Sequence, residues 1–388
     1  MFQTVLCRLG PIALFLALGL SSPAAEVEVA PTRGGRFIGA TGCKSSSCHG
    51  GAGEKRSQYI TWSQKDFHTR SYAILTNARS ARMAETLGLR AAQESSRCTV
   101  CHSPFQSVAT TRLVSADHPD ESVSCESCHG AAEPWLRGHT RKDWTYAMRV
   151  AAGMRDLKSF YVRANTCVAC HQNLDSNILK AGHPELTFEL DRQSVDEPKH
   201  WRDDDPSGGL RAWLVGQAVA LREMSWALSK SETPDAEEIA RWKGLSWLLA
   251  RTTAQQTNLP VIDQPTGSTN PGLFMSTQQQ ADLLARHTAQ FQFGDDFAGQ
   301  LLRRLATTDS DFAVTKDTSL DLLFRRAQRL VLALDRLSVA ATREASSTQK
   351  NPELTQLFED VRSRTDFQAP RFAEHLRNFR ATIDQSHL

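Results

Sequence analysis

Apolar residues in the second half of the chain recur with the period of an α-helix. One stripe runs from Leu210 to Leu228 and the strongest runs from Leu320 to Leu337, with apolar residues three or four positions apart in both. Start signals precede two further helical stretches. Thr233-Pro234-Asp235 predicts a helix with proline at its first position, and Ser276 fits a capping box with Gln279. This half of the chain is therefore expected to form an all-α helical bundle.

The preceding part of the chain, from residue 43 to about 190, shows few long periodic stretches and is dense in cysteine and histidine. One helix is indicated there. Thr61 and Gln64 fit a capping box, and the pattern runs from there towards Asn77. His68 falls on the apolar face of this helix. The predicted fold class is mainly α, with an irregular first domain of little regular structure ahead of the bundle.

Eight of the nine cysteines lie in four short motifs that each end in histidine. Three motifs have the form Cys-x-x-Cys-His, and the first has the longer form Cys-x4-Cys-His. Two thiols at this spacing can each form a thioether with a vinyl group of one haem, and the histidine then serves as the proximal iron ligand. Four covalently bound haems c are therefore predicted. Their motifs are Cys43, Cys48 and His49; Cys98, Cys101 and His102; Cys125, Cys128 and His129; and Cys167, Cys170 and His171.

Paired cysteines also serve other chemistries. Zinc knuckles and redox-active thiol pairs use the same Cys-x-x-Cys spacing, but neither requires a histidine directly after the second cysteine in four places. The longer motif is more ambiguous, because Cys43 and Cys48 could form a disulfide across a serine-rich loop in an oxidising compartment. The ninth cysteine, Cys7, lies in a segment that we expect to be removed.

The N-terminal segment has the pattern of a secretory signal peptide. Arg8 is followed by a largely apolar run from Leu9 to Leu20, and small residues precede Glu26, which suits cleavage after Ala24 or Ala25. The run is shorter than the roughly 20 apolar residues that span a bilayer, although an uncleaved anchor is the alternative. We expect a periplasmic or otherwise exported protein with no membrane span in the mature chain.

These patterns divide the chain into four segments. A signal peptide occupies residues 1–25, a tetrahaem cytochrome c domain 26–190, a charged and turn-rich linker 191–209, and a helical bundle domain 210–388. The second segment offers too few residues per haem to wrap each porphyrin in a shell of its own, so the haems are expected to pack against one another.

Each iron also needs a second axial ligand, and the remaining histidines of the first half are the candidates. His68, His139 and His183 are favoured because they lie among the motifs, whereas His118 and His200 are the two further candidates. Methionine ligation is the alternative and would raise the potential of the haem concerned. The methionines available for it are Met83, Met148 and Met154.

The formal net charge of +2 is close to balanced, but four haems would add eight propionates. The stretch from Leu136 to Arg163 holds seven basic residues against two acidic ones. We interpret this stretch as propionate-facing, with a solvated basic face as the alternative. Basic residues are not clustered across the chain as a whole, so the charge pattern does not indicate a nucleic-acid partner.

Part of the chain resembles a known family. The stretches Cys125–Leu136, His139-Thr140 and Ala181–Leu190 are similar to exported multihaem cytochromes grouped with the tetrahaem electron carrier of hydroxylamine oxidation, the cytochrome c-554 type. The resemblance covers about residues 40–202. The stretched first motif and the long helical half depart from that carrier.

The resemblance implies haems of low to moderate potential in closely stacked and angled pairs, most of them with two histidine ligands, and a role in electron transfer. It implies that His68, His139 and His183 are distal ligands. His118 is not part of the family pattern, so the resemblance implies that the haem on His102 lacks a sixth ligand.

Electron transfer between redox partner proteins is therefore the predicted function, and no catalytic residue is predicted. The first alternative is a multihaem oxidoreductase that acts on a small nitrogen or sulfur compound at a five-coordinate haem, for which Tyr146, Tyr161 and Arg163 could supply protons or charge. The second alternative is a subunit whose helical half assembles a larger respiratory complex.

Overall fold

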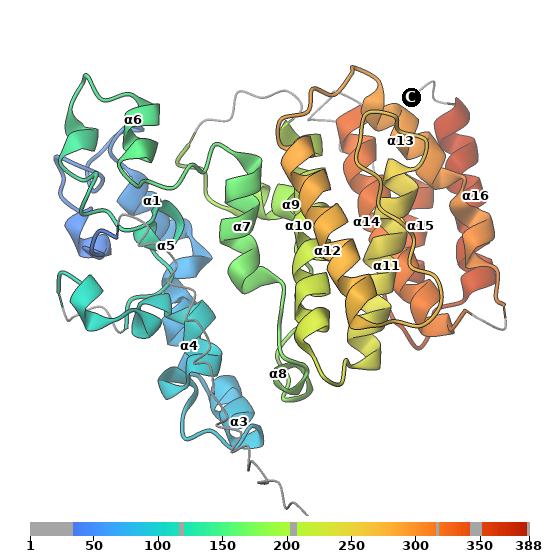
Figure 1. The fold of residues 1–388 in the computed structure, drawn as a ribbon, viewed down its shortest axis with the longest axis horizontal. Coiled ribbons are helices and arrows are strands. Elements are labelled where there is room, and N and C mark those ends of the chain that lie inside the picture. The colour runs from blue at the N-terminus through green and yellow to red at the C-terminus, as the bar shows by residue number, and fades with distance from the viewer. Residues whose placement is uncertain (1–33, 116–119, 202–207, 316–317, 342–350, 386–388) are drawn as a thin grey trace, which may run out of the picture. The chain divides into compact units, whose positions relative to one another are not determined.

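The long apolar stripes of the second half form helices that pack around one shared core (Figure 1). The structure, a computed structural model, describes residues 34–115, 120–201, 208–315, 318–341 and 351–385. The predicted signal peptide and His118 lie outside these residues. The helices of this half are α10 (Gly208–Lys230), α11 (Ala236–Thr253), α12 (Pro271–Thr288), α13 (Phe297–Ala306), α14 (Leu320–Ala341), α15 (Pro352–Asp360) and α16 (Ala369–Gln385).

Tryptophan side chains fill the centre of this bundle. Trp213, Trp242 and Trp247 are almost completely buried. The indole N–H of Trp242 donates to the hydroxyl of Ser225 at 2.8 Å, and its ring meets that of Phe274 edge-on at a centroid distance of 4.9 Å. The buried indole is therefore hydrogen-bonded as well as packed, which avoids the cost of an unpaired buried donor.

The two apolar stripes lie in helices as predicted, but the helix starts differ from the prediction. The residues that face the core run from Leu210 to Leu228 in α10 and from Leu323 to Leu337 in α14, whereas Leu320, the predicted first residue of the second stripe, is exposed. Pro234 precedes α11 instead of opening it, because Asp235 is the N-cap and accepts from the Glu237 N–H at 2.8 Å. The capping box predicted at Ser276 is wrong: Asn270 caps α12 six residues earlier.

The first half consists of short helices. The chain is 62% helix with no strand among the described residues, which confirms the mainly α class. A single bridge between Phe37 and Leu113 is the only β-type pairing in the described part. The short helices are α1 (Gln58–Lys65), α2 (Ser71–Leu75), α3 (Ala78–Thr86), α4 (Ser96–His102), α5 (Cys125–His129), α6 (Tyr146–Ala151), α7 (Phe160–His171), α8 (Ser176–Lys180) and α9 (Leu190–Asp196).

The helix predicted from Thr61 to Asn77 is wrong in its bounds. Helix α1 begins earlier and stops at Asp66, whose backbone is extended. The Asp66 carboxylate accepts from the backbone N–H of His68 at 2.8 Å and starts a separate 3₁₀ turn, Phe67–Arg70. An aspartate that caps a following turn competes with continuation of the helix that precedes it.

Residues Gly35–Leu388 form one compact unit, in which α7 and α9 of the first half pack against α10 of the bundle (Figure 1). A Cβ on Gly216 would lie 2.8 Å from the Cβ of Leu190, so glycine permits this close approach between α10 and α9. The predicted division at residues 191–209 stays a prediction. No helix of the described residues is long and apolar enough to cross a membrane.

Candidate haem-binding site

Each regular motif occupies the last turn of a helix. The histidines His102, His129 and His171 are the final residues of α4, α5 and α7. In an α-helix, residues three and four positions apart share a face. The first cysteine, the second cysteine and the histidine of each motif therefore lie on one side of the helix, which is the arrangement that a single porphyrin requires.

The longer first motif reaches a similar compactness through a loop. The backbone N–H of His49 donates to the carbonyl of Cys43 at 3.2 Å, and that of Gly50 donates to Ser45 at 3.0 Å. A Cβ on Gly50 would lie 1.8 Å from the carbonyl oxygen of Lys44, so the loop closes only with glycine there. The two extra residues are thus absorbed within the loop.

Each motif histidine faces a second histidine from elsewhere in the chain. An iron bound by two imidazoles at about 2 Å from each nitrogen separates the ring centroids by roughly 6 Å. The four observed separations agree with this value. They are 6.0 Å for His49–His139, 6.0 Å for His171–His68, 6.3 Å for His102–His183 and 6.3 Å for His129–His200.

Hydrogen bonds fix the tautomer of most of these rings. A neutral imidazole that donates from Nδ1 keeps the lone pair on Nε2, where it can bind a metal. Backbone carbonyls and one amide oxygen serve as acceptors. The Nδ1 partners are Gln58 Oε1 at 2.9 Å for His49, Ser71 O at 3.1 Å for His102, Leu136 O for His139, Pro184 O at 2.8 Å for His183 and Pro198 O at 3.3 Å for His200.

The ring of His171 has an amide as its Nδ1 neighbour. The Gln193 Nε2 atom lies 3.2 Å away, while the Oε1 atom of the same amide is buried without a hydrogen-bond partner among the described residues. If the amide is turned over, Oε1 accepts from Nδ1–H and both groups are satisfied. Ligation through Nε2 of His171 is compatible with that arrangement.

Burial keeps several of these imidazoles neutral. Burial, together with the nearby His200, lowers the pKa of His129 to about 4. Burial also lowers the pKa of His102, His139 and His171. Because the neutral imidazole is the metal-binding form, these side chains are prepared to act as ligands.

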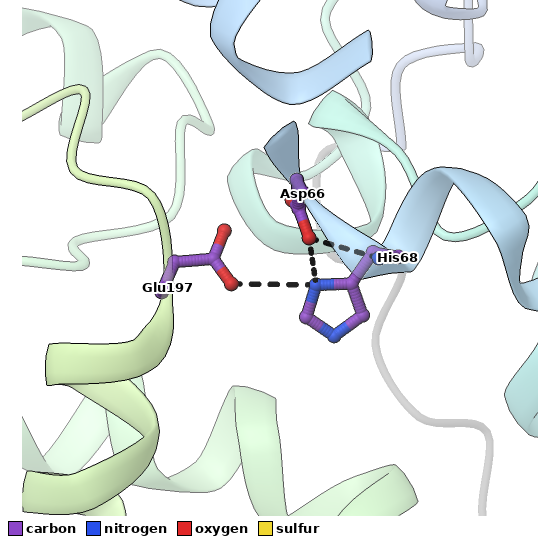
Figure 2. Close-up of side chains that lie close together, drawn as sticks. All are labelled: Asp66, His68 and Glu197. Atoms are coloured by element: carbon purple, nitrogen blue, oxygen red, sulfur yellow. Dashed lines mark hydrogen bonds and ion pairs between the residues drawn. The ribbon is translucent and has the colours of Figure 1, made fainter. Parts of the chain in front are cut away.

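His68 differs, because two carboxylates approach its Nδ1 atom (Figure 2). Asp66 Oδ1 lies at 2.9 Å and Glu197 Oε2 at 3.4 Å, and the three ligand atoms fall within 4.8 Å of one another. The hydrogen bond to Asp66 and then the contact with Glu197 raise the pKa of His68 to about 10. The carboxylates therefore favour positive charge on this ring, which either a second proton or a metal at Nε2 can supply.

Thiols from different motifs also lie close together. All eight cysteines in the described part are free thiols. The thiol of Cys43 interacts with that of Cys125, and the thiol of Cys101 interacts with that of Cys170. The partner thiol raises the pKa of Cys125 and of Cys170. The first motif is thus adjacent to the third, and the second to the fourth.

Apolar side chains beside the ligands are unusually exposed. Phe67, next to His68, is 77% exposed, and Val100, between two motif cysteines, is 50% exposed. Single exposed apolar residues are common, so this exposure alone does not mark a site. The residues fit haem because each motif brings two thiols and a histidine to one place, opposite a second histidine.

Residues 43–130 match the family model described as cytochrome c554 and c-prime. This segment is thus similar to c-type cytochromes of the c-554 type. Similarity to a cytochrome c supports covalently bound haem c and redox partners. The match spans the first three motifs, and the fourth lies beyond it. No curated protein and no solved structure matched the chain.

The basic stretch Leu136–Arg163 follows the matched segment, and one of its arginines binds the backbone of that segment. Arg155 Nη1 donates to the carbonyls of Ser127 at 2.7 Å and Cys128 at 3.1 Å, near the end of α5. A cation at a helix C-terminus is favourable because the last carbonyls carry partial negative charge. Arg163 lies over the rings of Phe160 and Trp201. The propionate-facing role stays a prediction.

Ion pairs to α14 hold the segment that carries His183. These ion pairs were not predicted from the sequence. Glu185 lies 3.1 Å from Arg325, and Asp191 lies 2.8 Å from Arg336. Arg325 and Asp191 are buried. Pairing of charges between distant parts of a sequence leaves no periodic signal, so only the fold shows which arginines meet this segment.

Proposed function

We propose that the protein is an exported tetrahaem c-type cytochrome that transfers electrons between redox partners. The observation that carries this proposal is the set of four histidine pairs at centroid distances of 6.0–6.3 Å, each with one motif histidine. When bound, haem c supplies a reversible one-electron change at iron.

The chain's own residues would hold each centre at three points. The two cysteines of each motif would anchor the porphyrin, and the motif histidine and the paired histidine would bind its iron. The distal ligands we propose are His139 for the first motif, His183 for the second, His200 for the third and His68 for the fourth. Methionine ligands are then not required.

Two histidines on each iron favour electron transfer over catalysis, because no coordination position is left for a small substrate. The resemblance implied an open position on the His102 haem. His183 faces His102 at 6.3 Å, which supports six ligands there as well. The oxidoreductase alternative would require one of these pairs to open.

The adjacency of the motifs supports a continuous chain of centres. The first motif meets the third through Cys43 and Cys125, and the second meets the fourth through Cys101 and Cys170. Cys128 of the third motif also lies within electrostatic range of Cys167 of the fourth. Neighbouring centres in the order first, third, fourth, second would then be close enough to exchange electrons.

Ion pairs support a scaffold role for the helical half. Arg325 and Arg336 of α14 pair with Glu185 and Asp191, which lie near the two ends of the stretch that directly follows His183. The bundle would then fix a distal ligand of the second centre. Assembly into a larger respiratory complex would be a further role of its outer surface.

A reductive titration tests the electron-transfer proposal. The purified protein, matured with the cytochrome c machinery, should take up four electrons per chain reversibly, and its oxidised spectrum should not change with nitrite, hydroxylamine or nitric oxide. A high-spin component that shifts on adding one of these compounds would favour the oxidoreductase instead. Recovery of the protein from the periplasm tests export.

A further inference from the structure

Among the paired histidines whose Nδ1 contacts are described, His68 alone has carboxylates at this atom (Figure 2). The others meet backbone carbonyls or glutamine amides. The four proposed centres therefore do not have equivalent surroundings. The centre between His68 and His171 differs from the rest by up to two negative charges next to a ligand.

Burial and two hydrogen bonds hold the Asp66 carboxylate in place against the His68 ring. Its side chain is 7% exposed and accepts from both the Nδ1 and the backbone N–H of His68, at 2.9 and 2.8 Å. Asp66 also ends α1, so its backbone position is set by the helix that precedes it. The ring is thereby held with Nδ1 on the carboxylate and Nε2 free.

Glu197 reaches the same ring from a distant part of the chain. It directly follows α9, and its Oε2 atom lies 3.4 Å from Nδ1, beyond a good hydrogen bond but within ion-pair range. Its side chain is 25% exposed, so solvent weakens its effect. Asp66 is therefore the main partner and Glu197 the weaker one.

We infer that Asp66, supported by Glu197, holds the reduction potential of the centre between His68 and His171 below the value that a neutral acceptor would give. A carboxylate on the far nitrogen of a ligating histidine makes that ligand a better electron donor, and its negative charge favours the oxidised metal. Asp66 is a positioning residue in this sense, because it acts through His68. The inference rests on the proposed function, since it requires His68 to be a ligand.

The test is spectroelectrochemical titration of the haem-loaded protein with Asp66→Asn. Asparagine keeps the shape and an acceptor oxygen but removes the charge. One midpoint potential should rise by about 59 mV, which corresponds to a tenfold change in a one-electron equilibrium, and the other three should stay unchanged. Glu197→Gln should shift the same midpoint in the same direction by less.

Asp196→Asn is the matched control. Asp196 precedes Glu197 and pairs with Arg192 at 2.8 Å on the surface, so the same charge is lost without contact to a ligand. If Asp66→Asn moves no midpoint, or moves it no more than Asp196→Asn does, the inference is overturned. If Asp66→Asn does not bind haem, Glu197→Gln takes its place in the test. The inference is then overturned if Glu197→Gln moves no midpoint, or moves it no more than Asp196→Asn does.

Failure of the inference and failure of the proposed function give different results. Four low-spin haems with an unmoved midpoint in Asp66→Asn overturn the inference alone. Fewer than four haems, or a high-spin haem, in the unmodified protein would overturn the proposed function. The electron paramagnetic resonance signal that Asp66→Asn alters should be the one that disappears in His68→Ala, which assigns the centre.

Discussion

Replacing Arg336 by methionine should destabilise the protein by about 3 kcal/mol at neutral pH. Arg336 is the partner of Asp191 at 2.8 Å and of Glu189 at 3.5 Å, and both carboxylates are more than nine-tenths buried. Removing one partner of a buried ion pair leaves an uncompensated charge, which costs roughly 3–5 kcal/mol. The lower end applies because Arg336 itself is 22% exposed. Methionine retains much of the packing of the arginine stem.

The loss of stability caused by Arg336→Met should be smaller at acidic pH. Burial already raises the pKa of Glu189 and of Asp191 in the folded protein, and loss of Arg336 would raise both further. A carboxyl whose folded pKa lies above its unfolded pKa takes up protons in the folded state first, so stability relative to the unmodified protein recovers as the pH falls through the folded pKa. The loss should therefore be largest at neutral pH.

Urea unfolding followed by far-ultraviolet circular dichroism measures this effect between pH 4 and 7. Arg377→Met is the control, because Arg377 is half exposed and pairs with Asp309 at 3.3 Å; it should cost less than about 1 kcal/mol. A loss below 1 kcal/mol in Arg336→Met, or the same loss at every pH, would refute the reasoning. The low-spin signal of the centre that His183 ligates should weaken in Arg336→Met.

Three further predictions concern the motifs and the bundle. Gly50→Ala should prevent closure of the first motif loop, so the haem-to-protein ratio should fall from four to three; an unchanged ratio would contradict the loop geometry. His200→Ala should convert the His129 centre to high spin in electron paramagnetic resonance, and an unchanged spectrum would point to His118 as ligand. Asp282→Asn should lower the free energy of unfolding by about 1 kcal/mol at pH 7. Burial raises the pKa of Asp282, but its hydrogen bonds outweigh this and bring it to about 2. The difference should therefore shrink as the pH falls from 4 to 2 and be lost below pH 2; a difference at pH 2 as large as that at pH 7 would oppose it.

The bundle was largely predictable because its core follows helical periodicity. The stripe from Leu210 to Leu228 is buried as expected, since it reflects a single helix face. Helix starts were less predictable. The helix start predicted at Ser276 is wrong because Asn270 caps the helix instead, directly ahead of a proline in the first turn. Asp66 ended the predicted helix around His68 by capping a turn of its own.

The motifs could be read from spacing, because each one closes over a few residues. The partners of the motif histidines could not, because they come from distant segments. His68 pairs with the fourth motif across more than a hundred residues, and His139 with the first across ninety. Only the packing of the short helices determines such pairs. The buried contacts of Arg336 escaped the sequence for the same reason.

The measurement that tests the account most directly is the ratio of haem iron to polypeptide, together with the spin state, in protein matured with the cytochrome c machinery. We predict four haems per chain, all low-spin in the oxidised protein. Fewer haems, a high-spin centre, or zinc in place of iron would contradict the account.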